Sequence, residues 1–331
     1  MKPPRRSAIA LSLVAVTVLA AIYVFGAQPL QTPARRVEDS PTPHATISIG
    51  GDADFTRIGT GSGCECVRHG VGTNQEPYLI SAWVVNASRG RGIQIFGTSA
   101  HFVIRNVRVY GDSLNVGISL DRVENGKIED SLISQNHVAI YAFASHDIAF
   151  VNNTISRNQY GILLEGSDNN LVSSNAFEEI EDVAIFVRGS DNVVRNNLVA
   201  RGKFGGINID GTPGIADGNV VESNLIVENA SYGIGMWRAT NCLVRGNVVN
   251  RNGVGIMLTD QSEGNLVERN NVTQSVGDGI VITEGSVGNI VRGNIARGNG
   301  DGVSAFDLHD MSLNNVWQDN DYSTKEPETL D

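Results

Sequence analysis

The feature that most constrains the fold is a phrase that returns ten times between Gly92 and Asn320. Successive copies begin 22 to 27 residues apart, a period typical of solenoids and other repeat arrays. The second residue is Ile in nine copies and Val in the tenth, and a mostly apolar residue follows two positions later, which is the alternation of a β-strand. The copies open at Gly92, Gly117, Ala139, Gly161, Ala184, Gly206, Gly233, Gly255, Gly279 and Gly302.

The residues between these strands exclude helical repeats, because each copy carries several Asn, Gly and Ser, which favour turns. Asn tolerates a left-handed backbone and can hydrogen-bond the Asn of the next coil, so a bend can repeat in register. One corner is predicted at Asn153, Asn175, Asn197, Asn224, Asn247, Asn271, Asn294 and Asn320. A second corner, three residues before the small residue, is predicted at Asn136, Asn158, Asn229, Asn252 and Asn299.

Short parallel strands joined by such bends predict an all-β fold of the pectate-lyase type, a single-stranded parallel β-helix with about ten coils. The general rule for connections between parallel strands makes it right-handed. We expect the solenoid to occupy residues 92–322, with Trp317 and Tyr322 closing the last coil and a polar tail over residues 323–331. Residues 45–91 do not yet show the period, and we expect them to form an N-terminal cap and entry strands.

The front of the chain predicts export from the cytoplasm. Three basic residues precede an apolar run, Ser7–Gly26, whose 20 residues at ~1.5 Å each would just span a ~30 Å hydrocarbon core. Residues 1–27 are therefore a signal peptide or a membrane anchor, and the preceding positive charges place the rest of the chain outside. Residues 28–44, with four Pro, are expected to be an extended linker.

The charge balance argues against a nucleic acid as partner. The formal net charge is -11, Lys is scarce, and Arg is scattered along the chain without forming a basic stripe that could meet phosphates.

Strand alternation predicts two outward rows of side chains that stack along the solenoid. The first outward row, two residues after the small residue, is Gln94, Ser119, Tyr141, Leu163, Phe186, Asn208, Gly235, Met257, Val281 and Ser304. The second outward row, four residues after it, is Phe96, Asp121, Phe143, Glu165, Arg188, Asp210, Trp237, Thr259, Thr283 and Phe306.

Aromatic and charged side chains are mixed in the middle coils of these rows, with Asp121 and Arg238 beside them. Flat rings suit the apolar faces of pyranoses, and charged groups suit their hydroxyls. The predicted substrate-binding residues are Tyr141, Phe143, Glu165, Phe186, Arg188, Asp210 and Trp237. The alternatives are that a loop or a second copy of the protein covers this face, which would make it a homo-oligomer contact, or that it is plain surface.

The same residues raise the question of catalysis. Glu165 and Asp210 lie two coils apart, about 9.6 Å at a ~4.8 Å strand spacing, with Arg188 between them. Carboxylates at such a separation can act as acid and base in inverting glycoside hydrolysis, and an Arg between acids could serve a uronate lyase. Alternating charges also stabilise stacked strands without any chemistry. Neither an adjacent Asp pair nor a Gly-His-Gly of the polygalacturonase kind occurs, so we assign no catalytic residue.

The phrases Gly-Ile-x-Leu and Asn-x-Ile resemble those of the NosD-like parallel β-helix proteins, a periplasmic copper-binding group placed with carbohydrate-binding and sugar-hydrolase repeats. The resemblance runs from Thr73 to Tyr322 and includes the entry Pro77-Tyr78-Leu79-Ile80 and the exit Asn314-Asn-Val-Trp317. It implies the β-helix fold and leaves the function open, because the superfamily contains lyases, hydrolases, epimerases, adhesins and accessory proteins.

Two further groups of residues are candidates for chemistry. Asp307-Leu308-His309-Asp310 resembles the Asp-Pro-His-Asp/Glu of alginate epimerases, but Leu308 replaces Pro and the motif lies in the final coil, so we favour a polar capping loop. Cys64-Glu-Cys66 with His69 could bind a soft ion such as Cu(I), as the copper-binding group would imply, whereas exported proteins more often use cysteines in disulfides. Copper and calcium are the metals considered, and Cys242 is expected to be a lone thiol.

Three functions follow from the sequence. The first is an exported β-helix, tethered to the membrane or secreted, that binds a surface polysaccharide. The second is a lyase, hydrolase or epimerase acting on a uronic-acid glycan through Glu165, Arg188 and Asp210 or through Asp307, His309 and Asp310. The third is a NosD-like accessory protein for the maturation of a copper enzyme.

Overall fold

The computed structural model describes residues 40–56, 65–214, 216–283, 285–300, 302–312, 314–328 and 330. These residues belong to one compact unit, Ser40–Asp331. The predicted signal or anchor segment and the linker up to residue 39 lie outside the described residues. Within the described part of the chain, no helix is long and apolar enough to cross a membrane.

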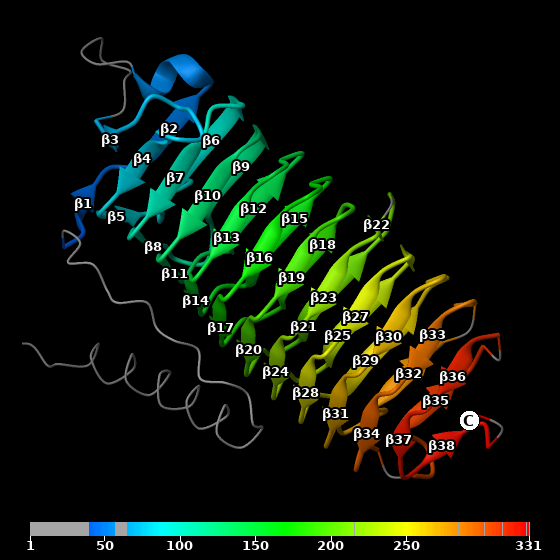
Figure 1. Cartoon of the computed structure of the whole chain (residues 1–331). Helices are drawn as coiled ribbons and strands as arrows, with labels where there is room; N and C mark the ends of the chain where they lie inside the picture. The colour runs from blue at the N-terminus through cyan, green and yellow to red at the C-terminus, as the bar shows by residue number, and fades with distance from the viewer. Residues whose placement is uncertain are drawn as a thin grey trace, which may run out of the picture. The chain divides into compact units, whose positions relative to one another are not determined.

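Three sheets of twelve strands run side by side along this unit (Figure 1). Sheet 1 contains β2 (Ile47–Gly50), β6 (Ile93–Thr98), β9 (Val116–Val123), β12 (Val138–Phe143), β15 (Tyr160–Glu165), β18 (Val183–Arg188), β21 (Gly205–Asp210), β25 (Tyr232–Trp237), β29 (Val254–Thr259), β32 (Ile280–Ile282), β35 (Leu308–Asp310) and β38 (Lys325–Glu326). Sheet 2 contains β3 (Val67–His69), β4 (Tyr78–Ser81), β7 (Phe102–Arg105), β10 (Gly126–Glu129), β13 (Ala149–Val151), β16 (Leu171–Ser173), β19 (Val193–Arg195), β23 (Val220–Glu222), β27 (Leu243–Arg245), β30 (Leu266–Glu268), β33 (Ile290–Arg292) and β36 (Val316–Gln318). Sheet 3 contains β1 (Thr42–His44), β5 (Trp83–Asn86), β8 (Arg108–Tyr110), β11 (Leu132–Ser134), β14 (Thr154–Ser156), β17 (Ala176–Glu178), β20 (Leu198–Ala200), β24 (Leu225–Val227), β28 (Val248–Asn250), β31 (Asn271–Thr273), β34 (Ile295–Arg297) and β37 (Asp321–Tyr322).

Each coil takes one strand from each sheet, and ten such coils run from β6–β8 to β35–β37. Neighbouring coils pair in parallel, and β3 pairs with β4 in the antiparallel sense. The short pair β22 (Ala216–Asp217) and β26 (Ala239–Thr240) lies outside the three sheets. The predicted parallel β-solenoid of the right-handed type, with about ten coils, is confirmed.

The apolar residues of each phrase stack in the interior. Ile162, Ile185 and Ile207 are aligned by strand pairing and fully buried, so the sequence column is a physical row. The small residue before them is required by the close approach of the next coil. A Cβ on Gly206 would lie 2.4 Å from the carbonyl oxygen of Gly233, closer than van der Waals contact allows.

Buried Asn side chains connect successive coils in columns. In one step of the first column, the backbone N–H and Nδ2 of Asn175 both donate to Oδ1 of Asn197, at 2.9 and 3.1 Å. Nδ2 also donates to the carbonyl of Phe150 in the preceding coil, at 2.9 Å. Such bonds satisfy the polar groups that a bend would otherwise bury unpaired.

The first Asn column follows the prediction except at one position, where Asn270 takes the place predicted for Asn271. The preceding Arg269 has a left-handed backbone, with φ of 54°, and the buried column residue follows it directly. Asn271 instead opens β31 on the outer face. Because two Asn residues are adjacent here, the sequence pattern placed the wrong one of them in the column. All five predicted residues of the second corner are buried, whereas a third column was not predicted and comprises Asn170, Asn192, Asn219, Asn265, Asn289 and Asn315.

The N-terminal end of the core is covered by aromatic packing. Phe55, in the short 3-10 helix η1 (Asp52–Phe55), stacks on Tyr78 with ring centroids 4.4 Å apart and also contacts Phe102. The segment predicted as linker up to residue 44 contributes β1, which pairs with β5.

The prediction for the tenth coil was wrong in its register. Val303 is 81% exposed, and Leu308 takes the core position, paired with Ile280. The phrase at Gly302 lies in an inserted bend, so His309 and Met311, instead of Ser304 and Phe306, continue the outward rows. The residues predicted as a polar tail include β38, and Leu330 is buried in the core. Trp317 is buried and Tyr322 packs against the core, as predicted.

Comparing two adjacent Asn residues tests the register of the columns. In Asn270→Ala, two donors of Asn247 and the carbonyl of Val244 lose their partner, so the free energy of unfolding should fall by about 2–4 kcal/mol. Asn271→Ala, on the outer face, should change it by less than about 0.5 kcal/mol. Urea unfolding followed by circular dichroism measures both, and equal effects would contradict the assigned register.

Candidate functional site

The two predicted outward rows lie on the outer face of sheet 1. Strand pairing aligns Tyr141 with Leu163 and Phe186 with Asn208 in the first outward row. In the second outward row, Phe143 is flanked by Asp121 and Glu165. We call the aromatic and charged residues of the two outward rows between β9 and β25 the strip; it consists of Asp121, Tyr141, Phe143, Glu165, Phe186, Arg188, Asp210 and Trp237.

A continuous polar network holds the centre of the strip. Arg188 donates from one terminal nitrogen to Oε1 of Glu165 at 3.0 Å and from the other to Oδ2 of Asp210 at 2.9 Å. The Tyr141 hydroxyl donates to Oε2 of Glu165 at 2.7 Å, and the backbone N–H of Thr212 donates to Oδ1 of Asp210 at 2.7 Å. All four oxygens of the two carboxylates therefore have partners within the protein.

The network also changes the chemistry of Tyr141. Burial and the hydrogen bond to Glu165 raise the pKa of Tyr141 to about 12, so the hydroxyl is a neutral donor over the physiological range. With both carboxylates of the network engaged by Arg188, the arrangement is that of a fixed polar surface. It does not offer an isolated carboxyl group and a facing base.

The aromatic rings of the strip lie at defined positions. A Cβ on Gly235 would lie 2.1 Å from the Trp237 ring, so the indole lies over this glycine and leans toward Tyr232, whose ring centroid is 5.1 Å away. The guanidinium of Arg188 lies over Phe186 at 5.0 Å. Tyr141 and Phe143 stack, with centroids 6.4 Å apart, and Phe143 is 42% exposed.

A hollow of about 190 Å³ opens at the N-terminal end of the strip. It is lined by Arg91, Ser119, Asp121, Tyr141 and Phe143, and Arg91 donates to the Ser119 hydroxyl at 3.0 Å. Arg91 was not predicted, although a signal exists in the sequence. Arg91 stands directly before the small residue Gly92, and the same position carries Tyr160 and Tyr232 in other copies. The ring of Tyr232 is buried against Phe204 and Trp237.

Polar atoms that are buried without a hydrogen bond concentrate on this face. Among the described residues, six buried side-chain oxygens or nitrogens have no hydrogen-bond partner, and three belong to sheet 1: Oδ1 of Asp121, Nε of Arg188 and Oδ1 of Asn208. Asp121 Oδ1 lies 3.2 Å from Nε of Arg122, an exposed side chain, without hydrogen-bond geometry. Such groups are rare in folded proteins, and each calls for an explanation.

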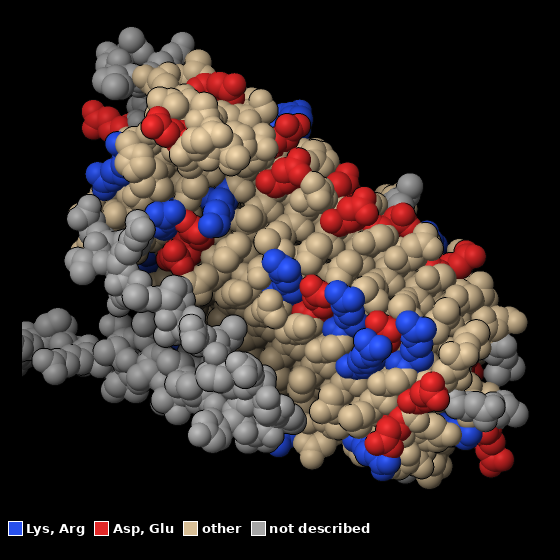
Figure 2. All heavy atoms as spheres, viewed as in Figure 1, with Lys and Arg blue, Asp and Glu red and all other residues tan. Residues whose placement is uncertain are grey.

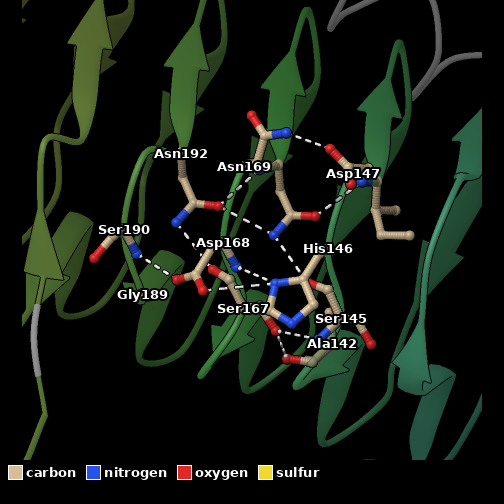
Figure 3. A network of polar contacts seen from close by, with 12 residues as sticks. Ala142, Ser145, His146, Asp147, Ser167, Asp168, Asn169, Gly189, Ser190 and Asn192 are labelled. Carbon is tan, nitrogen blue, oxygen red and sulfur yellow. Dashed lines mark hydrogen bonds and ion pairs between the residues drawn. The ribbon is translucent and has the colours of Figure 1, made fainter.

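A second polar ladder lies in the turns between sheets 1 and 2 (Figure 3). His146 and Asp168 point toward one another, and the Asp168 backbone N–H donates to Nδ1 of His146 at 3.1 Å. Ser190 reaches Asp168 through its backbone N–H, and its hydroxyl accepts from the Asp217 N–H. The Ser190 hydroxyl bonds Asp217 instead of His146, so these residues do not form a Ser-His-Asp relay.

The outer face of sheet 2 carries alternating charges without the rings of the strip. Figure 2 shows basic and acidic side chains alternating over β19 to β33, and strand pairing aligns them in one row. Arg245 pairs with Glu222 at 2.6 Å and Arg292 with Glu268 at 2.8 Å. This row has the pattern expected of cross-strand stabilisation.

The motif Asp307-Leu308-His309-Asp310 is divided by the structure. Asp307 and Asp310 are buried, and Asp307 accepts from Asn299 and from the backbone N–H groups of Ser323 and Thr324. Asp310 accepts from Nε1 of Trp317 at 2.9 Å. Both carboxylates thus close the last coil. His309 alone faces outward, 3.2 Å from Oδ1 of Asp278.

The family described as periplasmic copper-binding protein (NosD) matches residues 98–276, more than half of the chain. The chain belongs to the NosD family. No curated protein matches this NosD-family chain.

Several solved structures share the fold at low identity. A mutant form of the periplasmic alginate epimerase AlgG has a TM-score of 0.56 and 16% identity, over 74% of this chain and 85% of that chain. The enzymatically active domain of tailspike protein 2 from bacteriophage CBA120 has a TM-score of 0.57 and 12% identity, over 76% of this chain and 42% of that chain. The catalytic domain of a GH87 alpha-1,3-glucanase in complex with nigerose has a TM-score of 0.50 and 14% identity, over 90% of this chain and 71% of that chain. The chain spans less than two thirds of the tailspike proteins that it matches.

The donor groups of this NosD-family chain do not fit a copper site in the part that the structure describes. There, no three His, Cys, Asp or Glu side chains are grouped to hold a metal ion. Cys66 is buried and disulfide-bonded, so its sulfur is not available as a thiolate, and His69 is exposed; Cys64 lies outside the described residues. Cys242 is a free thiol as predicted, but burial raises its pKa to about 11, and its sulfur contacts amide and carbonyl groups. The described residues also contain no group of three carboxylates that could hold a calcium ion.

The contribution of Arg188 to the strip can be measured by substitution. Arg188→Met removes the hydrogen bonds to Glu165 and Asp210 and leaves two carboxylates facing each other across one strand, so the free energy of unfolding should fall by about 1–3 kcal/mol. The matched control is Arg195→Met on the exposed face of sheet 2, which should change it by less than about 0.5 kcal/mol. Equal urea midpoints for the two variants would show that the network does not stabilise the fold.

Proposed function

We propose that this chain binds a linear polysaccharide along the strip on the outer face of sheet 1. The observation that carries the proposal is the combination of rings and fixed polar groups in register on one face. Tyr141, Phe143, Phe186 and Trp237 offer ring surfaces on successive odd coils, between carboxylates that Arg188 holds in place. Rings that are partly buried and polar groups that are already oriented lose little entropy when a ligand binds.

Binding is favoured over turnover by the state of the carboxylates. In inverting hydrolysis, one carboxyl group must hold a proton for the leaving group and the other must activate water. Glu165 and Asp210 share Arg188, and their remaining oxygens accept from Tyr141 and Thr212. The polar groups of the strip can accept hydrogen bonds from sugar hydroxyls and donate hydrogen bonds to them. They do not provide one group that gives a proton and a facing group that takes one.

Other proteins with this fold supply a parallel. The glucanase domain was solved with the disaccharide nigerose, and AlgG is named as an alginate epimerase. Their identity to this chain is low, so the parallel supports only the idea that a face of such a solenoid can hold a glycan.

The place of action that we propose is outside the cytoplasm, with the chain tethered to the membrane or secreted. The proposal is supported by the basic residues and apolar run at the N-terminus, by the periplasmic description of the family, and by the disulfide at Cys66, since disulfides persist in oxidising compartments.

In a bacterial host, the full chain should be degraded by protease added to cells whose outer barrier has been opened. Protection in intact spheroplasts would contradict export.

Glycan binding is tested with the full chain against immobilised polysaccharides, followed by titration with the best ligand. Trp237→Ala should lower the affinity at least about tenfold, because stacking on the indole is lost. Leu132→Ala, which removes an exposed apolar side chain on sheet 3, should leave the affinity unchanged. Intrinsic tryptophan fluorescence should change on binding in the wild type and in Leu132→Ala.

Two results would overturn this function. One is the failure of every polysaccharide to bind the folded chain. The other is a change of molar mass in light scattering, from an oligomer to a monomer, when Trp237 is replaced, since a second copy would then be what covers the strip.

A further inference from the structure

The strip repeats every second coil. In the second outward row, carboxylates stand on β9, β15 and β21, as Asp121, Glu165 and Asp210. Between them stand side chains of another kind: Phe96 on β6, Phe143 on β12, Arg188 on β18 and Trp237 on β25. The alternation holds without a break over seven coils, from Phe96 to Trp237.

The first outward row keeps the same phase. Tyr141 on β12 and Phe186 on β18 stand on the strands that carry no carboxylate, and on β25 the indole of Trp237 itself covers the position of Gly235. Ring surface therefore returns every two coils, about 9.6 Å at a ~4.8 Å strand spacing, and a hydrogen-bond acceptor returns with the same interval between the rings.

This interval has a chemical counterpart. In an extended glycan whose neighbouring sugars are turned over relative to one another, the same face of the sugar returns with every second unit. Successive equivalent faces are then separated by the length of one extended disaccharide, which is close to two coils. Pyranose faces would meet the rings, and the hydroxyls at the edges of the intervening sugars would meet the carboxylates.

The charges of the strip indicate which glycans fit. Three carboxylates lie in the second outward row, and Arg188, the basic residue of that row, already donates to two of them. The third, Asp121, is paired with Arg122, whereas Arg91 at the hollow keeps its positive charge because its partner Ser119 is a neutral hydroxyl. A polyuronate would place further carboxylates against this row, in which the basic side chains other than Arg91 are already paired, and like charges in contact disfavour binding.

The hollow supplies an acceptor for an uncharged ligand. Oδ1 of Asp121 is buried without a hydrogen-bond donor in suitable geometry, and it lines the hollow together with Tyr141 and Phe143. A sugar hydroxyl can donate to such an oxygen while the sugar ring packs on the neighbouring aromatic side chains. The carboxylate of a uronate has only acceptors and cannot donate, so a uronate could approach this oxygen only through one of its ring hydroxyls.

We infer that the ligand of the strip is an uncharged, extended glycan lying along the direction in which the coils stack, with one disaccharide for every two coils. The inference rests on the proposed function and specifies its substrate class. The repeat of the protein sets the repeat of the ligand, and the carboxylate row disfavours acidic polymers.

The test uses isothermal titration of the full chain with oligosaccharides of increasing length. Neutral cellulose-type and mannan-type series are compared with alginate and polygalacturonate series of the same lengths. The affinity for a neutral series should rise mainly when a pair of sugars has been added, and acidic oligosaccharides of equal length should bind at least about tenfold more weakly. Asp121→Asn, which keeps an acceptor oxygen and removes a charge, should narrow this difference several-fold.

The control is Asp191→Asn at an exposed turn outside the strip, which should leave the discrimination unchanged. Unfolding midpoints show that each variant is folded. Tighter binding of the uronates, or equal gains for every added sugar, would overturn the inference and leave glycan binding intact. If none of the oligosaccharides or polymers binds, the proposed function itself fails.

Discussion

The direct stacking of one coil on the next is the constraint on which this structure depends. Parallel pairing aligns the apolar residues of successive phrases, so that Ile162, Ile185 and Ile207 form one buried row. The Asn columns make the same alignment obligatory at the corners, because each side-chain amide accepts through Oδ1 from the coil before and donates through Nδ2 to the coil after. A slip of one residue would bury polar side chains and break these bonds together. The regular outer faces are a consequence of this internal register.

The fold and most of the strip could be predicted because they repeat. The period, the inward Ile and the outward rows follow from strand alternation, and the pairs Phe143 with Glu165 and Asp210 with Trp237 lie where alternation placed them. The predictions failed where the repeat is interrupted. The column prediction failed at Asn271 because the sequence does not reveal that Arg269 has the left-handed backbone and that Asn270 follows it in the column. The register of the final coil was wrong because Gly302-Val303 has the sequence of the repeated phrase but lies in an inserted bend.

Other features depend on contacts that no period encodes. Arg91 lines the hollow from the position directly before the small residue, which the two predicted outward rows do not include. The way Arg188 joins Glu165 and Asp210 is a matter of side-chain reach across two strands, which alternation permits but does not determine. The family description names copper, whereas the described residues contain no group of three His, Cys, Asp or Glu side chains placed to hold a metal ion.

The carboxylate of Asp307 changes the way in which one of the Asn columns ends. It receives the backbone N–H and Nδ2 of Asn299 as another Asn would, but a carboxylate has no N–H to hand on, and its other oxygen accepts from the chain's own last bend. The row of side-chain amides therefore ends at Asp307, while its backbone N–H donates to the hydroxyl of Thr324 at 2.9 Å, in the bend that leads to β38. A carboxylate thus completes this corner at the last full coil, and only the short strand β38 continues the stack beyond it.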